Sequence, residues 1–134
     1  MNLTYTVNKK PDLLFDYLTD MQKFVSVHPV ITKIDDLGNN NYLVHETLKI
    51  GFIPVSFTYP VAIESNFSDK TVVIIATVMK LTKIKMNFII KQQTGFSSVE
   101  ETIDFKSPLP VKSIMQRIFK KQHEELFKNI GNLT

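Results

Sequence analysis

Two glutamates of this chain interrupt rows of apolar residues, where a carboxylate is unusual. Glu46 interrupts an alternating row formed by Tyr42, Val44, Leu48 and Ile50. Glu101 interrupts a second row, formed by Val99, Ile103 and Phe105. Alternate residues of a strand point to the same face of a sheet, so both carboxyl groups are predicted to face the interior, where burial raises a carboxyl pKa. Glu46 and Glu101 are therefore candidates for an acid–base pair that enolises or dehydrates an apolar carbonyl compound.

A structural role is open for each of these glutamates. A local bulge, or a position near the rim of the sheet, would leave either carboxylate in contact with water. Buried ion pairs also perturb carboxylates without taking part in a reaction. The pattern names Glu46 and Glu101 as candidates and leaves both interpretations open.

A third polar residue lies on the apolar stripe of a predicted C-terminal helix. At 3.6 residues per turn, the stripe of this helix contains Val111, Met115, Ile118 and Leu126. Gln122 lies at the centre of the stripe. Its amide could orient a ligand alongside the Tyr42 and Tyr59 hydroxyls, or it could be a buried amide bonded to a tyrosine or to the backbone. Because a buried unpaired amide costs free energy, a pocket-lining position is favoured.

The three histidines do not have the spacing of metal ligands. His45 is out of phase with the apolar row and is predicted to face water. His28 precedes a proline, where it would cap or pack, and His123 is placed on the flank of the helix. The chain has no cysteine, and it contains neither a glycine-rich phosphate loop nor a serine nucleophile elbow. We therefore expect no metal site and no cofactor.

The elements that carry these residues follow two periodicities. Residues 2–7 alternate as a strand does, and Pro11 is typical of the first turn of a helix. A second short helix is predicted over 21–27, because the residue before a proline leaves the helical region. Period-two patterns predict six further strands, near residues 31–37, 42–50, 55–67, 71–80, 83–93 and 96–106. With a long helix over 110–131, residues 1–134 are predicted to form a single α+β domain.

The sizes of these elements predict an internal cavity. Seven strands about 4.8 Å apart form a sheet roughly 30 Å wide, whereas one helix with its side chains covers about 10–12 Å. A sheet curled around a single helix often leaves an apolar space suited to a hydrophobic ligand, and complete filling by side chains is the alternative. The inward rows and the helix stripe predict these ligand-contacting residues: Tyr42, Val44, Phe57, Tyr59, Ile74, Met86, Phe88, Val99, Phe105, Met115, Ile118 and Gln122.

The turns between strands predict where the cavity would open. Alternate turns of an antiparallel meander lie at the same end of the sheet. One set of turns is polar, whereas the other set carries Phe52, Ile53, Leu81 and Leu109. Exposed apolar residues at one end indicate a pocket mouth, a partner surface or a membrane contact, unless they pack on one another. We interpret these four residues as the pocket mouth.

Residues 14–38, "LFDYLTDMQKFVSVHPVITKIDDLG", resemble the helix-grip proteins of the START-like, or SRPBCC, superfamily. The polyketide cyclase/dehydrase and coenzyme-Q-binding branches are the most similar. Members often have an aspartate followed at four, seven and nine residues by an aromatic residue, a tryptophan and a proline. The matching positions here are Asp20, Phe24, Val27 and Pro29, so valine replaces the tryptophan. The resemblance implies a curved sheet around a C-terminal helix with an apolar cavity between them, and it leaves the activity undecided.

Composition limits the classes of partner. The net charge of +3 is too small to indicate nucleic-acid binding. Four lysines form an outward stripe that we interpret as a solvated face: Lys80, Lys83, Lys85 and Lys91. No apolar run is long enough to span a bilayer or to form a signal peptide, so we expect a cytoplasmic protein without stable membrane insertion. The sequence does not indicate an oligomeric state.

Three functions are compatible with these observations. The first is binding of a small hydrophobic molecule, such as a lipid, an isoprenoid or a polyketide-like aromatic compound. The second is an enzyme of the cyclase, dehydratase or isomerase kind that uses Glu46 and Glu101. The third is a protein-interaction module. We favour binding over catalysis, because no motif in the chain establishes a reaction.

Overall fold

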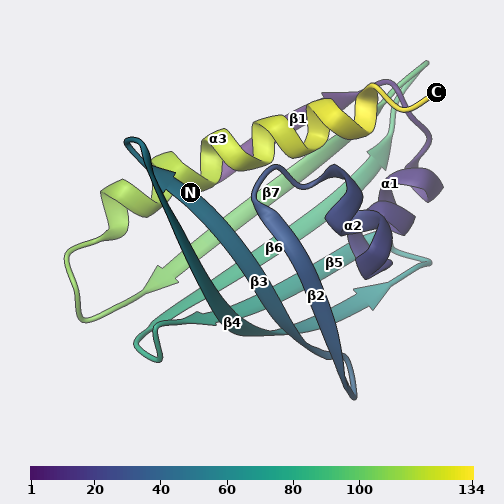
Figure 1. Ribbon diagram of the computed structural model, residues 1–134. Helices are drawn as coiled ribbons and strands as arrows, with labels where there is room; N and C mark the ends of the chain where they lie inside the picture. The colour runs from purple at the N-terminus through teal and green to yellow at the C-terminus, as the bar shows by residue number, and fades with distance from the viewer.

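The chain folds into seven strands and three helices, and the computed structural model describes residues 1–134 (Figure 1). The side chain of Ile50 lies outside the described part, and so does its predicted inward position. The strands are β1 (Asn2–Val7), β2 (Ile31–Gly38), β3 (Asn41–Ile50), β4 (Ile53–Asn66), β5 (Thr71–Val78), β6 (Thr82–Gln92) and β7 (Ser97–Lys106). The helices are α1 (Pro11–Thr19), α2 (Met21–Val27) and α3 (Lys112–Gly131).

The seven strands form one antiparallel sheet in the order β1-β7-β6-β5-β4-β3-β2. The sheet curves around α3, while α1 and α2 cover the region near the C-terminal end of α3 (Figure 1). β4 pairs with β3 along its whole length, but it pairs with β5 only from Val61 to Asn66. The first half of β4 is therefore free to leave the plane of the sheet and to close the grip around α3.

Local chemistry explains where the two short helices begin and end. Pro11 is the first residue of α1, where its missing N–H costs nothing. Asp20 separates the helices, because its carboxylate accepts hydrogen bonds from the backbone N–H groups of Gln22 and Lys23 and so caps α2. The buried side chains of α1 and α2 include Leu14 and Phe24, which join the core above the sheet. These two helices thus form one wall of the interior.

The predicted α+β helix-grip fold is confirmed, including the two short helices after the first strand. The long helix begins at Lys112 rather than at residue 110, because prolines at 108 and 110 disfavour helical backbone in the residues before them. The β3–β4, β5–β6 and β7–α3 connections lie at one end of the molecule, as predicted (Figure 1). The topology therefore brings Glu46, Gln122 and their neighbours inside one curved sheet.

Candidate functional site

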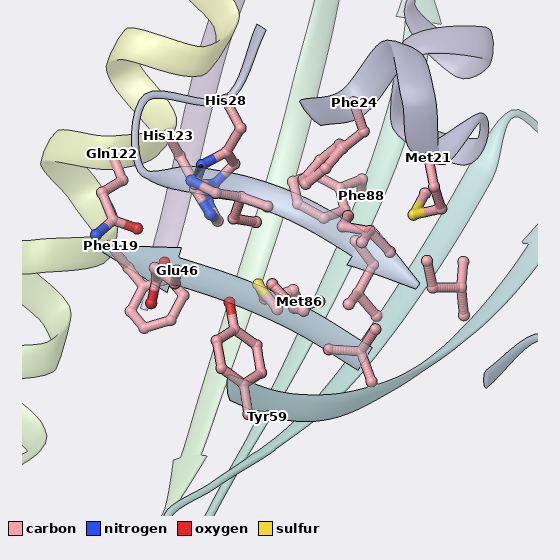
Figure 2. A pocket seen from close by; sticks show the side chains of 16 residues that line it. Met21, Phe24, His28, Glu46, Tyr59, Met86, Phe88, Phe119, Gln122 and His123 are labelled. Atoms are coloured by element: carbon pink, nitrogen blue, oxygen red, sulfur yellow. Dashed lines mark hydrogen bonds between the residues drawn. The ribbon is translucent and has the colours of Figure 1, made fainter. Parts of the chain in front are cut away.

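Two cavities lie between the sheet and the helices. The first, of about 40 Å³, is enclosed by α2, α3 and side chains of strands β2 to β6 (Figure 2). The second, of about 80 Å³, lies under the first half of α3, where Met115 and Ile118 line it. One water needs about 10–15 Å³ of such space, so each cavity has room for several waters or for a compact apolar group.

Five residues line both cavities, and we call them the waist: Glu46, Tyr59, Met86, Phe119 and Gln122. In Figure 2 the Glu46 carboxyl, the Tyr59 hydroxyl and the Gln122 amide enter the same region from β3, β4 and α3. The other two waist residues are apolar. The waist therefore gathers polar groups at one place in an interior that is otherwise mostly apolar.

Glu46 faces the interior, which confirms the predicted direction of its side chain. It lies on β3 between Ile31 of β2 and Phe57 of β4, and only 8% of it is exposed. Burial raises its pKa from 4.5 to about 7, and the nearby His123 lowers it slightly. Burial and the Glu46 charge also raise the pKa of Tyr59, so its hydroxyl stays protonated. Near neutral pH the waist contains one carboxyl group that can gain or lose a proton.

Glu101 lies behind His123 and lines neither cavity. It is 1% exposed, and its Oε2 lies 2.6 Å from His123 Nδ1, while its Oε1 accepts a hydrogen bond of 3.4 Å from the Tyr5 hydroxyl. The expectation that two glutamates face one cavity is therefore corrected. Glu101 can reach a ligand only through His123, which does line the first cavity.

His28 is the second histidine at the first cavity. Its Nδ1 accepts hydrogen bonds of 3.2 Å from the backbone N–H groups of Val30 and Ile31, which turns the chain from α2 into β2. Burial lowers the pKa of His28 to about 3, and the His123 ring, 6.5 Å away, adds to this effect. His28 is therefore a neutral hydrogen-bond acceptor that caps a turn, in agreement with a capping role.

The neutral His28 ring predicts sensitivity to acid. The unfolded state binds a proton at this residue below pH 6.5, whereas the folded state does so only near pH 3, so His28 costs stability as the pH falls below 6.5. His28→Asn keeps an acceptor and removes the titration. We expect the variant to lose about 2 kcal/mol less than the unaltered protein between pH 7 and pH 5, measured by urea unfolding. Equal losses in the two proteins would contradict this prediction.

Most of the predicted ligand-contacting residues line at least one cavity. They are Val44, Phe57, Tyr59, Ile74, Met86, Phe88, Met115, Ile118 and Gln122. The other three lie elsewhere: Tyr42 lines a surface groove beside α2, Val99 is fully buried in the core, and Phe105 packs on Phe119 with ring centroids 5.7 Å apart. A period-two pattern identifies the face of a strand but not the position along it, so these three could not be distinguished from the rest.

The four residues predicted at the pocket mouth are exposed and line neither cavity: Phe52, Ile53, Leu81 and Leu109. They do lie at the end of the molecule towards which the second cavity extends (Figure 1). Their role as a mouth stays a prediction.

The sequence analysis missed several wall residues: Met21, Phe24, His28, Ile31, Ile34, Phe119 and His123. Helical periodicity could have identified some of them. Met21, Phe24 and His28 are spaced by three and four residues, as are Phe119, His123 and Leu126, which is the spacing of one helix face. The prediction that His123 lies on the helix flank is wrong, because its ring is buried between Phe88 and Phe119.

Comparison with known proteins places the fold in a wider group. The family model of CoxG, a component of carbon monoxide dehydrogenase, matches residues 4–132. No curated protein matches the sequence.

Several solved structures share the fold at low sequence identity. A conserved protein from Geobacillus kaustophilus has a TM-score of 0.79 at 9% identity, over 97% of this chain and 91% of that chain. A START superfamily protein from Mycobacterium smegmatis has a TM-score of 0.75 at 15% identity, over 100% and 98%. The Zhui aromatase/cyclase from a Streptomyces species has a TM-score of 0.71 at 10% identity, over 97% and 89%. At these identities the similarity establishes the helix-grip fold.

Proposed function

Because the chain belongs to the carbon monoxide dehydrogenase CoxG family and has the fold of START-superfamily and aromatase/cyclase proteins, we propose that it binds a small hydrophobic molecule between the sheet and α3. One observation carries the proposal. The two interior cavities have mostly apolar walls and share a waist at which polar groups are gathered. This is the usual composition of a small-molecule site, in which apolar walls supply affinity and a few polar groups set orientation.

The cavities limit the size of the bound group. Sites for drug-sized molecules are commonly about 300–1,000 Å³, well above the volumes of about 40 and 80 Å³ found here. A compact group, such as one aromatic ring or the end of an isoprenoid or acyl chain, therefore suits the closed form. A larger lipid or polyketide-like ligand requires that Phe119 or Met86 move, since these apolar waist residues separate the cavities.

The waist sets the expected chemistry of the ligand. Glu46 in its neutral form can donate a hydrogen bond, and the Gln122 amide can donate or accept one. An apolar molecule with a single hydroxyl or carbonyl oxygen would satisfy these groups when it displaces cavity water. The ligand class that we propose is therefore a lipid, an isoprenoid or an aromatic compound with one such oxygen near the end that enters the waist.

Filling the second cavity should abolish binding. Ile118→Trp places a large side chain in this cavity, and we expect at least tenfold weaker binding of 2-naphthol, a compact aromatic compound with one hydroxyl, measured by NMR titration. Ile114→Trp is the matched control, because Ile114 lies one turn earlier on α3 and is exposed. Native mass spectrometry of freshly purified protein would identify a ligand retained from the cell. Equal binding by both variants would exclude this cavity as the site.

Acid–base catalysis is the second candidate, and the Glu46 environment is the observation that favours it. A carboxyl group with a pKa of about 7 at a cavity wall can both remove and return a proton at neutral pH. His123, held by Glu101, would be the partner that faces the substrate. Glu46→Gln distinguishes the two functions: a binding protein keeps its ligand, whereas an enzyme that still binds loses turnover.

A further inference from the structure

Exposed apolar side chains gather at the end of the molecule where α3 begins. They come from the β3–β4 and β5–β6 turns with the start of β4, and from the β7–α3 loop with the first turn of α3 (Figure 1). We call them the apolar tip, which consists of Phe52, Ile53, Val55, Met79, Leu81, Leu109 and Ile114. Of the eleven large apolar side chains exposed in the described part of the chain, these seven lie here.

The tip residues project from the surface. Phe52 is fully exposed at the end of the β3–β4 hairpin, and Met79 is 76% exposed in the β5–β6 turn. Their exposure shows that they do not pack on one another, which was the alternative left open by the sequence. A group of exposed apolar side chains on a folded domain usually marks a contact surface. Because they stand on separate connections, they suit a partner that deforms around them.

The charges around the tip have one sign. The segments 47–56, 77–83 and 105–114 contain five lysines and no acidic residue: Lys49, Lys80, Lys83, Lys106 and Lys112. All five lysines are exposed. Turns at other places on the sheet differ, since the β2–β3 region carries Asp35 and Asp36 and the β4–β5 region carries Glu64 and Asp69. The positive charge is therefore concentrated beside the projecting apolar side chains.

We propose that the apolar tip docks on the surface of an anionic lipid bilayer. The lysine ammonium groups would lie at the level of the phosphates, each contributing attraction to an anionic surface, while the apolar side chains enter the interfacial region. A fluid interface accommodates separate projecting side chains, whereas a protein partner would need matching pockets. No described helix has the length and apolarity to span a bilayer, so the contact is peripheral. This inference does not depend on the proposed function.

Vesicle co-sedimentation tests the inference with the full chain. We expect binding to vesicles of 70% phosphatidylcholine and 30% phosphatidylglycerol, and at least tenfold weaker binding to pure phosphatidylcholine or at 0.5 M salt (about 0.1 M being the reference). Phe52→Ser with Met79→Ser should weaken binding about tenfold. Leu37→Ser with Ile89→Ser is the matched control, because these two exposed apolar residues lie outside the tip.

Charge reversal provides an independent test. Lys80→Glu with Lys106→Glu should weaken binding to anionic vesicles at least tenfold, because about 1 kcal/mol per basic residue is lost and repulsion is added. Lys10→Glu with Lys128→Glu changes the net charge equally at exposed positions away from the tip and should have a smaller effect. Equal losses in the two pairs, or no binding to anionic vesicles, would overturn the inference. A tip-dependent dimer in light scattering without vesicle binding would assign the surface to a second copy instead.

Discussion

Replacing His123 with leucine is expected to lower the free energy of unfolding by about 3–5 kcal/mol, because it leaves a carboxyl group buried with an inadequate partner. Glu101 is 1% exposed, and without the imidazole its remaining hydrogen bond is the 3.4 Å contact from Tyr5. Urea unfolding followed by circular dichroism measures the change. The double replacement Glu101→Leu with His123→Leu should recover most of the loss, since two apolar side chains of similar size leave no unpaired group.

The chain contains a matched control for this prediction. His45 and Asp35 form a second histidine–carboxylate pair at 2.7 Å, almost the same distance as the 2.6 Å of His123 and Glu101. That pair is partly exposed, so water replaces the lost partner in His45→Leu and the destabilisation should be much smaller. Similar losses for the two histidines would show that burial of Glu101 is not the source of the effect.

Replacing Glu46 with glutamine is expected to make the protein more stable above pH 7 and to change little near pH 4.5. The folded-state pKa of Glu46 is about 7 and its usual value is 4.5, so the folded state retains the proton to higher pH than the unfolded state does. The contribution of Glu46 to stability is therefore fully present below pH 4.5 and is lost as the pH rises to about 7. Glu46→Gln removes this loss, and its advantage should grow to about 3 kcal/mol by pH 8.

Urea unfolding of both proteins at several pH values between 5 and 8 checks the Glu46 prediction. Glu100→Gln serves as the control, because Glu100 is exposed on β7 and pairs with Lys91 at the surface. A stability difference that stays constant with pH would show that Glu46 is not desolvated at the waist. A glutamate that costs stability at neutral pH is expected at a functional site, where the rules of a well-packed core are commonly broken.

The two stability predictions concern groups that face different surroundings. Glu101 and His123 satisfy each other inside the core, so removal of one partner is costly. Glu46 has no such partner among the described hydrogen bonds and faces cavity space instead. A ligand oxygen at the waist would satisfy Glu46, which is why the same residue carries the proposed function and the pH dependence.

The sequence by itself determined the fold, because its signals are local. Period-two alternation identified the strands, Pro11 and Asp20 marked the starts of the short helices, and the stripe through Met115, Ile118 and Gln122 predicted the long helix. The sheet-to-helix width ratio then required a curved sheet around α3. The same patterns predicted that Glu46 points inward, since the direction of a strand side chain depends only on its phase.

Only the tertiary structure decided which inward residues share one space. Glu46 and Glu101 have the same phase on their strands, yet β3 carries Glu46 to the cavity wall while β7 carries Glu101 beneath His123. That difference depends on how far each position lies along the curved sheet and on which turn of α3 covers it. Neither quantity is encoded in a period of two residues or of 3.6, because both arise from contacts between segments distant in the chain. Phase selects the face, and packing selects the neighbours.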